Sequence, residues 1–523
     1  MDEREKIQQL RKIKVILTEI FMFISVIFLV IFLTLIVTGY SFNLKQFGKT
    51  DGEFIERTGL VQISSKPVGA TVSIDGEQQL LLRTNGSKTL SSGDHEIILS
   101  KDGYGQWEKT VSIKEGMMHR VNYPRLFLNE LEEEKVASFP KATFMTTSPN
   151  MEKMIVLQDG GLFLFHLNNA KQAVESIKVE KFGKIESLSE VKWSGNSERM
   201  LAKINGKYGV INIKNPAESF YLEEVTKEEV GDIEFQSDGG GELVALFKTG
   251  EVREIDIKNK KLGEIVAEGV VRFDNDGEKL VFLEKDKNTE SYEIKTYRIG
   301  DEESYSLRAR KTNSEEKIEN GSVVEGENDE ESREDKTGEI DDVEGLEVSD
   351  ISELSSLFKI PANQNTIIST MEYFQESFVL VADGEDVKVL SSEEWGDEEV
   401  GMEIVYEGKV GFEVQKVEKK GKGMVFGLVG KNGEGAVFDI ENLEVTKREK
   451  DIEEGSETGW IDEFLRYEID KTGKVTIFDY DWMNERELVE EGASNKFDIV
   501  ISGNGKWLYY FKENDLYRER IRY

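Results

Sequence analysis

The chain has 523 residues, with 103 Asp and Glu against 67 Lys and Arg, and therefore a formal net charge of −36 at pH 7. Because proteins hold phosphate backbones with Lys and Arg, this balance argues against nucleic acid as a partner. The absence of Cys excludes disulfides and thiolate metal sites, and His95, His119 and His166 lie far apart in the sequence. At about 100–200 residues per domain, the length predicts two to four domains.

An apolar segment near the N-terminus predicts a membrane-spanning helix over residues 15–38. Residues 20–37 carry no charge, and only Ser25 and Thr34 among them are polar. At 1.5 Å per residue they span about 27 Å, close to the hydrocarbon thickness of a bilayer. A buried core helix is one alternative, but such helices are rarely apolar on every face. A cleaved signal peptide is another, although this run is longer than a typical signal core and no A-x-A pattern follows it.

The charges that flank this segment predict its orientation. Residues 1–14 form a short tail rich in Lys and Arg, whereas the connector at 39–58 contains only Lys45, Lys49 and Arg57 as basic residues. By the positive-inside rule, the tail is cytoplasmic and the bulk of the chain is extracytoplasmic. We therefore expect a single-pass protein of the cell membrane whose acidic part faces outward.

Residues 59–128 change to an alternating pattern that predicts a small antiparallel β domain, a sandwich or barrel. Apolar residues recur at every second position, as half-buried strands require, at 61 and 63, 72 and 74, 97 and 99, and 111 and 113. Turn residues separate these strands. Pro67 and Gly69 lie between the first two, and Asp75-Gly76 gives a strong hairpin signal after the second.

The same segment resembles the PEGA domain, which is named for a Pro-Glu-Gly-Ala motif. Val68 stands where the motif has its glutamate, and the segment from Leu90 to Tyr104, followed by Trp107, fits the later part of the pattern. The resemblance implies a module of bacterial or archaeal surface proteins without known catalysis, and a structural role for the turn residues. These turn residues are Pro67, Gly69, Ala70, Asp75 and Gly76.

The remaining residues, 140–523, repeat a unit made of an apolar strand, a polar turn with Gly or Asn, and two further strands. Eight hairpin turns can be counted, spaced mostly about 40–48 residues apart, which is the period of a four-stranded propeller blade. The pattern therefore predicts a β-propeller. The turns centre near residues 159, 205, 249, 287, 383, 431, 471 and 513.

One interval, from residue 287 to 383, is longer than the others by about fifty residues. Within it, residues 301–350 hold 19 Asp and Glu against 6 Lys and Arg, and Tyr305 is their only aromatic residue. Such a segment buries too little apolar surface to offset the entropy of ordering, so we predict a disordered acidic insertion. Without it, the array gives about 42 residues per blade for eight blades or about 48 for seven. The hairpin count favours eight, and a repeat shared between the two ends of the array would give seven.

The turn sequence of an aromatic residue, Ser, a variable residue, Asp or Asn, and Gly resembles the WD-like β-propeller repeat found in periplasmic translocation proteins and in the propellers of some peptidases. In that family the aromatic residue and the Gly serve blade packing and chain reversal. The resemblance therefore implies structural roles, and no ligand role, for Trp193, Phe235, Gly239, Phe273 and Gly277.

Candidate catalytic and metal sites are few. Asp274–Gly277 lacks the alternating oxygen ligands of an EF-hand, and Gly430–Gly435 lacks the Gly-Lys-Ser/Thr of a phosphate-binding loop. Asp470, Asp479 and Asp481 could converge at the mouth of a propeller channel, although chance clusters are expected among 103 acidic residues. We therefore assign no catalytic, cofactor-binding or metal-binding residue, and no cofactor.

These features favour a binding or scaffold protein that presents a propeller at the cell envelope to a protein or a cell-wall glycan. The alternative is an extracytoplasmic propeller enzyme, such as a quinoprotein or a glycan-active enzyme, whose site in the channel has no recognisable motif. A sensor is a third hypothesis, but the cytoplasmic tail is so short that a partner would have to pass on the signal. The oligomeric state stays open at this point.

Overall fold

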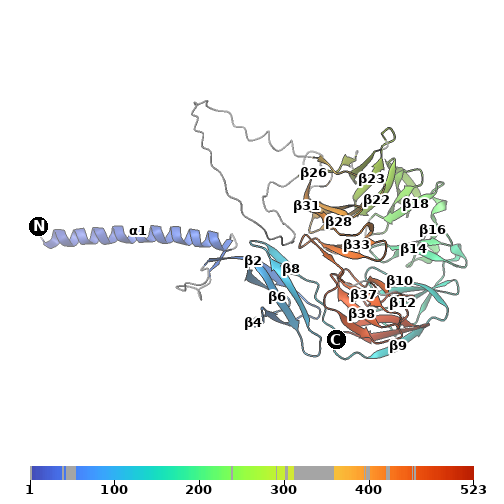
Figure 1. The fold of residues 1–523 in the computed structure, drawn as a ribbon, viewed down its shortest axis with the longest axis horizontal. Coiled ribbons are helices and arrows are strands. Elements are labelled where there is room, and N and C mark those ends of the chain that lie inside the picture. Colours follow the sequence, from blue (N-terminus) through green and yellow to red (C-terminus); the bar gives the residue numbers. More distant parts are fainter. Residues whose placement is uncertain are drawn as a thin grey trace, which may run out of the picture. The chain divides into compact units, whose positions relative to one another are not determined.

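The computed structural model shows one long helix followed by β structure (Figure 1). Helix α1 spans Glu3–Val37, so most of the predicted tail is continuous with the predicted membrane segment. Its segment Leu17–Thr34 is long and apolar enough to cross a membrane, and none of it is buried. The structure describes residues 3–37, 40–42, 55–236, 239–289, 291–300, 304–310, 358–393, 395, 401–419, 424–449, 452 and 455–523.

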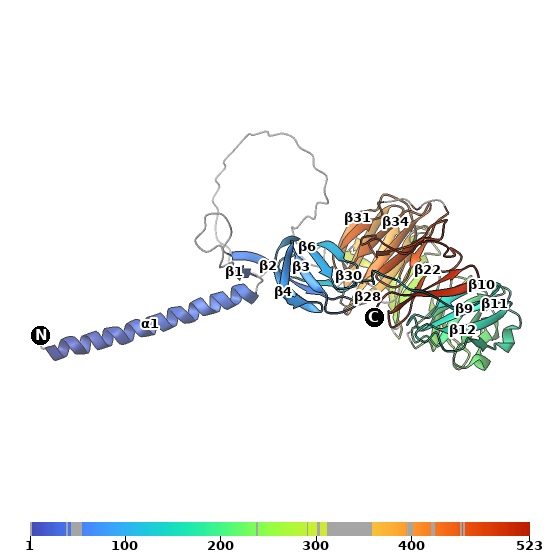
Figure 2. The same cartoon turned by 90° about the horizontal axis from the view of Figure 1, so that it is seen from below.

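The first β module, residues 55–128, holds two four-stranded sheets together with a short strand that precedes it. Its strands are β1 Tyr40–Phe42, β2 Ile55–Ile63, β3 Thr71–Ile74, β4 Glu77–Arg83, β5 Gly86–Ser91, β6 Gly93–Ser100, β7 Trp107–Ile113 and β8 Met118–Val121. One sheet has the order β4-β3-β6-β7, and Figure 2 shows β3, β4 and β6 close together in blue. The other has the order β1-β2-β5, with β8 beside β2.

The alternating sequence pattern explains the core of this module. Val61, Val72 and Leu99 are fully buried, whereas the intervening Ser73 is only partly covered. The pairing of β8 with β2 is parallel, which differs from the predicted all-antiparallel domain. The reason is that the chain crosses from one sheet to the other between β7 and β8 instead of turning back in a hairpin.

The start of the first module is tied to the end of helix α1. Strand β1 begins three residues after Val37, and it pairs with β2 so that Tyr40 lies opposite Arg57 and Phe42 opposite Ile55. Three residues reach at most about 11 Å. The covalent chain therefore keeps this sheet next to the end of the apolar helix.

The residues from 133 onward form a series of four-stranded antiparallel meanders in the described part of the chain. Consecutive strands are neighbours in most of these sheets, which is the construction of a β-propeller. The strands of the first four sheets are β10 Ala142–Thr147, β11 Lys153–Gln158, β12 Gly161–His166, β13 Glu175–Ile177, β14 Leu188–Trp193, β15 Arg199–Ile204, β16 Lys207–Asn212, β17 Phe220–Tyr221, β18 Val230–Phe235, β19 Glu242–Phe247, β20 Val252–Asp256, β21 Lys261–Ala267, β22 Val270–Asp276, β23 Lys279–Lys285, β24 Tyr292–Arg298 and β25 Tyr305–Ser306.

The next sheet has six strands, and the strand order of the two sheets after it again follows the sequence. The six strands are β26 Arg308–Arg310, β27 Phe358–Lys359, β28 Ile367–Tyr373, β29 Glu376–Asp383, β30 Asp386–Ser392 and β31 Met402–Lys409, in the order β27-β26-β31-β30-β29-β28. The following strands are β32 Val414–Glu418, β33 Val425–Gly430, β34 Gly435–Asp439, β35 Glu444–Lys447, β36 Glu457–Trp460, β37 Leu465–Ile469, β38 Val475–Asp479 and β39 Arg486–Val489.

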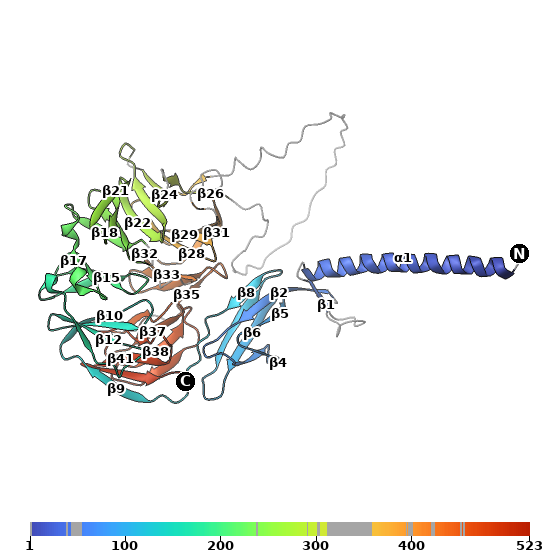
Figure 3. The same ribbon diagram turned by 180° about the vertical axis from the view of Figure 1, so that it is seen from behind.

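The last sheet is shared between the two ends of the array. Its strands β40 Val500–Ile501, β41 Trp507–Lys512 and β42 Asp515–Arg520 are joined by β9 Glu133–Ser138, which pairs with β42; Figure 3 shows β9 near β41. In the register of this pair, Leu516 lies opposite Ala137. Strand β9 precedes residue 140, where the sequence predicted the array to begin. With this shared sheet included, eight sheets are seen in the described residues from 133 onward.

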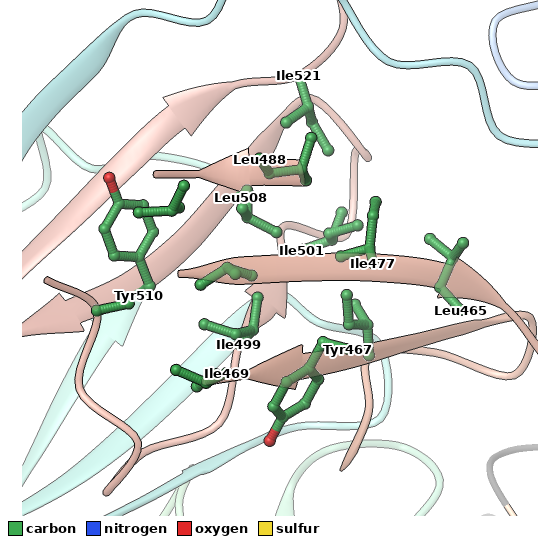
Figure 4. Packing of buried hydrophobic residues seen from close by; sticks show 14 of the residues in the cluster. Leu465, Tyr467, Ile469, Ile477, Leu488, Ile499, Ile501, Leu508, Tyr510 and Ile521 are labelled. Carbon is green, nitrogen blue, oxygen red and sulfur yellow. The ribbon is translucent and has the colours of Figure 1, made fainter. Parts of the chain in front are cut away.

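The chain forms two compact units. The first comprises Met1–Phe220, Glu418–Gly427 and Gly433–Tyr523, and the second comprises Tyr221–Val417 and Leu428–Asn432. Within the first unit, a core of almost fully buried side chains lies among β37, β38, β39 and β41, and Figure 4 shows its members Ile469, Ile477, Leu488, Leu508 and Tyr510. Within the second, strands β23, β29 and β30 contribute Val281, Leu283, Val379, Val381 and Leu390 to a separate core.

Most of the predicted acidic insertion at 301–350 lies outside the described residues. Its described part, 304–310, contains β25 and β26 and therefore differs from the predicted disorder. The physical reason is Leu307, which is 3% exposed and belongs to the core of the second unit. Burial of this one side chain stabilises an ordered start of the segment, which the acidic composition did not predict.

Candidate functional site at the junction of the first module

The predicted turn at Pro67, Gly69 and Ala70 connects β2 and β3, which belong to different sheets. Gly69 has a φ of +79°, a conformation that favours glycine, and its N–H donates to the carbonyl of Thr84 over 2.6 Å. Ala70 is fully buried, and the hydroxyl of Ser65 donates to the carbonyl of Pro67 over 2.7 Å. All of these contacts lie inside the first module.

The predicted turn at Asp75-Gly76 forms the hairpin between β3 and β4. Its φ angles of +52° and +76° are those of a type I′ turn. The carboxylate of Asp75 also makes two contacts that the hairpin sequence does not predict. It lies 2.6 Å from Nδ1 of His95 and accepts the N–H of Glu96 over 3.0 Å. Burial opposes ionisation here, but these two hydrogen bonds outweigh it and lower the pKa of Asp75.

The five predicted turn residues of the propeller lie at or near the turn after the first strand of a sheet. Trp193 ends β14, Phe235 ends β18, Gly239 follows β18, Phe273 lies in β22 and Gly277 follows β22. Nε1 of Trp193 donates to the hydroxyl of Thr146 in β10 over 3.0 Å, which links two neighbouring sheets. Phe273 is 7% exposed, and Gly277 has a φ of +64°.

The turn at Asp274–Gly277 leads from β22 into β23, and the side chain of Asp274 links β22 to strand β28. Oδ2 of Asp274 accepts the hydroxyl of Ser369 over 2.8 Å and the N–H of Thr370 over 2.7 Å. No group of three or more His, Asp or Glu side chains in the described residues is placed to hold a metal ion.

The three aspartates that the sequence suggested for a channel mouth have different hydrogen-bond partners, although Asp470 and Asp481 line the same pocket. Asp470 holds its own turn by accepting the N–H groups of Thr472 and Lys474. Asp479 and Asp481, which are 2% and 6% exposed, instead receive hydrogen bonds from side chains of the first module. The buried pair therefore marks a junction between β7 and the end of β38.

A tryptophan and an asparagine saturate one oxygen of Asp479. Nε1 of Trp107 donates to Oδ2 over 2.6 Å, and Nδ2 of Asn484 donates to the same atom over 2.9 Å. Asn484 also exchanges two hydrogen bonds with the backbone of Glu108, of 2.9 and 3.0 Å. Strand β7 is an edge strand, so Asn484 satisfies backbone groups that the sheet leaves unpaired.

Lys109 is the cation of this junction. Its Nζ donates to Oδ2 of Asp481 over 2.5 Å and lies 4.9 Å from the ring centre of Tyr123 and 5.0 Å from that of Tyr480. The two rings meet edge to face at 5.0 Å, and the Tyr480 hydroxyl donates to Asp439 over 2.6 Å. A buried ammonium in such a setting gains both ion-pair and cation–π stabilisation.

The pKa values show how the buried charges are tolerated. Burial, together with the charge of Asp481, raises the pKa of Asp479 to about 7, although the bonds from Trp107 and Asn484 favour its ionised form. Burial alone would lower the pKa of Lys109, but its contacts with Tyr123 and Asp481 outweigh this and raise it. The ammonium therefore stays charged beside Asp481, while Asp479 is partly protonated near pH 7.

Further contacts extend the junction. Arg120 forms an ion pair of 3.2 Å with Glu441, the N–H of Leu128 donates to the carbonyl of Ile521, and the N–H of Tyr523 donates to the hydroxyl of Tyr104. Residues 55–128 hold nine Lys and Arg against eight Asp and Glu, whereas residues 129–523 hold 51 against 89. A module without the acidic surplus of the rest of the chain therefore supplies cations to an acidic surface.

Two pockets border this junction on either side of the turn between β38 and β39. One, of about 450 Å³, is lined by Trp107, Arg125, Asp479 and Arg486 among others. The other, of about 320 Å³, is lined by Arg448, Asp481 and Trp482 among others. Pockets where two modules meet are common places for ligands. Sequence reasoning missed this junction, and its only local signal was the Asp-Tyr-Asp sequence at 479–481.

Comparison with known proteins gives one family match. Residues 58–125 match the PEGA domain, which confirms the predicted resemblance of residues 59–128. A search of curated proteins gives no match.

Several solved propeller structures are similar to the chain. The C-terminal WD40 domain of Sif2 is 9% identical, with a TM-score of 0.43 and coverage of 75% of this chain and 99% of that one. The β-propeller domain of Cps50 (Swd1) from Myceliophteria thermophila is 9% identical, with a TM-score of 0.37 and coverage of 74% and 99%. The WD40 domain of SCAP from fission yeast is 8% identical, with a TM-score of 0.40 and coverage of 75% and 94%. The assignment as a propeller rests on the strand order described above.

The first prediction concerns the ion pair at the junction. Lys109→Met leaves Asp481 buried without its cation, which should cost about 3–5 kcal/mol and lower the midpoint of thermal unfolding. Circular dichroism of the detergent-solubilised chain measures this midpoint. Arg57→Met is the matched control, because Arg57 and Glu115 are 58% and 48% exposed and such pairs contribute at most about 1 kcal/mol. Equal losses in the two variants would contradict the importance of the buried pair.

The second prediction concerns pH. The pKa of Asp479 rises from 3.8 to about 7 on folding, so its protonation stabilises the folded chain below about pH 4 and this stabilisation is lost as the pH rises through 7. Asp479→Asn keeps a neutral acceptor for Trp107 and Asn484. The variant should therefore gain thermal stability over the wild type between pH 5 and pH 8, by up to about 4 kcal/mol.

The control for this pH series is Asp470→Asn, because hydrogen bonds in its turn outweigh burial and lower the pKa of Asp470. Asp470→Asn should show no such gain at pH 8. A stability difference between Asp479→Asn and the wild type that is constant from pH 5 to pH 8 would contradict the raised pKa of Asp479.

Proposed function

We propose that this protein is a single-pass membrane scaffold that holds its β-propeller at the outer face of the cell membrane, where the propeller binds an envelope protein or a cell-wall glycan. The proposed role is binding rather than catalysis. The observation that carries the proposal is the continuous connection from an apolar, unburied helix through the first module to the last sheets of the propeller.

Each step of this connection is short. Strand β1 follows α1 within three residues and pairs with β2 of the first module. The other end of that module is held by Trp107 and Lys109, whose partners Asp479 and Asp481 are buried. A propeller attached in this way is confined to the membrane surface with limited freedom, which raises its local concentration for partners there.

The charge distribution supports the same role. The acidic surplus lies in residues 129–523, and a surface of this sign is repelled by anionic lipid. The first module, with nearly equal numbers of acidic and basic residues, has no such surplus. The propeller would therefore stand away from the bilayer and offer its loops to partners, while the first module stays close to the bilayer.

The absence of Cys from the chain allows a direct test in cells that express it. A single cysteine at exposed Lys171 (Lys171→Cys) should react in intact cells with a membrane-impermeant maleimide crosslinker and capture a discrete envelope protein or glycan. A cysteine in the N-terminal tail (Gln8→Cys) should react only after lysis, because the positive-inside rule places the tail in the cytoplasm.

Two results would contradict the proposal. Labelling of the tail but not of the propeller in intact cells would reverse the orientation. Labelling of the propeller without any crosslinked species, at this site and at other exposed loop positions, would remove the binding role.

A further inference from the structure

The pocket of about 450 Å³ at the junction is lined by basic and apolar residues from both modules. Arg125 belongs to the first module, and Arg486 begins β39 of the propeller. The apolar part of the lining includes Phe127, Leu465 and Ile477, which belong to the core of the first unit, and Figure 4 shows the last two. The lining of the pocket therefore combines one arginine from each module with apolar side chains.

Neither arginine is paired with a carboxylate within 4 Å in the described part of the chain. Arg125 is 6% exposed, and its Nη1 donates to backbone carbonyls, the best of them that of Tyr123 at 3.0 Å. Nη2 of Arg486 donates to the carbonyl of Leu128. A guanidinium has five N–H donors, so each of the two groups keeps donors that can bind a ligand. These donors are not used by a carboxylate, although the chain has many more acidic than basic residues.

Two further cations lie close by. Lys66 forms a backbone bridge with Arg125, and the guanidinium of Arg522 lies 6.0 Å from the ring centre of Phe127. Arg522 is 7% exposed, and its buried Nε has no hydrogen-bond partner. The charge of Arg125, with burial and Arg522 adding to it, lowers the pKa of Lys66. The cations here repel one another.

The acidic groups of the region compensate these cations only in part. Oδ2 of Asp479 is already occupied by Trp107 and Asn484, and its pKa of about 7 leaves it partly protonated. Asp462 accepts the backbone N–H groups of Phe464 and Leu465. The lining of the pocket also includes the acidic residues Glu108 and Glu485.

We propose that this pocket binds the oxyanion, a carboxylate or a phosphate, of a small ligand between the guanidinium groups of Arg125 and Arg486. Arginine suits this role because its planar fork matches the two oxygens of such an anion. The apolar side chains of the lining would accept a compact apolar or ring portion of the same ligand. The ligand would touch both modules and so strengthen their junction.

Gly105 gives the pocket a feature that can be tested without removing a charge. A Cβ built at this position would lie 1.7 Å from Nη1 of Arg486, so glycine leaves the room in which the guanidinium lies. Gly105→Ala should therefore displace the Arg486 side chain and keep its charge. Arg486→Gln removes the charge itself.

The experiment uses the full chain in detergent and records thermal unfolding with inorganic phosphate or succinate against chloride at equal ionic strength and pH. A bound anion stabilises the folded state by mass action, so phosphate or succinate should raise the midpoint of the wild type above its value in chloride. The increment should vanish in Arg486→Gln and shrink in Gly105→Ala. It should persist in Arg298→Gln, a control whose side chain is 54% exposed.

The response to the two probes separates the two kinds of anion, because phosphate alone would indicate a phosphate ligand and succinate alone a carboxylate ligand. For each variant, the midpoint in phosphate or succinate is compared with the midpoint of the same variant in chloride. A variant that is less stable in all buffers therefore remains informative. If Arg486→Gln does not fold, Arg486→Lys replaces it and should weaken anion binding at least tenfold by isothermal titration calorimetry. No specific increment in the wild type, or an equal increment in wild type and variants, would overturn the proposal.

Discussion

The burial of carboxylates at the junction between the first module and the last sheets is the constraint on which the rest of the structure depends. Asp439, Asp479 and Asp481 are 2%, 2% and 6% exposed in a chain with a net charge of −36. Buried charges of one sign are tolerated only where they are paired, hydrogen-bonded or neutralised. Lys109 pairs with Asp481, the Tyr480 hydroxyl bonds Asp439, and a raised pKa reduces the charge of Asp479.

This solution makes the first module part of the propeller's structure rather than a loose spacer. The apolar helix ends within three residues of a strand of the first module, and the module ends in contacts with the last sheets. The end of the apolar helix is thereby connected to the propeller through hydrogen-bonded strands and a buried polar junction. The proposed scaffold role needs this property, because presentation to a partner depends on orientation as well as on proximity.

Local features of the fold could be predicted from the sequence because their physics is local. Asp75-Gly76 predicts its hairpin since both residues tolerate a positive φ, and the apolar helix is defined by its own composition. The repeat of Gly- and Asn-containing turns predicted a series of four-stranded sheets in the same way. Strand β9 was not assigned to the array, because Ala137 meets its partner Leu516 only when the two ends of the array come together.

The candidate site could not be predicted for a related reason. Trp107 and Asp479 are 372 positions apart, and nothing in either local sequence indicates the other. Asp479 and Asp481 looked like members of a chance acidic cluster because the sequence does not show which carboxylates are buried. The sequence likewise could not predict that the two arginines line one pocket. A basic site is recognised in a sequence when its residues are adjacent, and these two come from different modules.

The most direct test of the central claim is a distance distribution between two spin labels, one on each side of the junction. The chain has no native Cys, so Asp94→Cys in the first module and Lys471→Cys in the turn after β37 give one specific pair at exposed positions. Double electron–electron resonance on the full chain should give a single narrow distribution, which broadens when Lys109→Met is added. A broad distribution in the unaltered junction would show that the first module moves freely and would contradict the account.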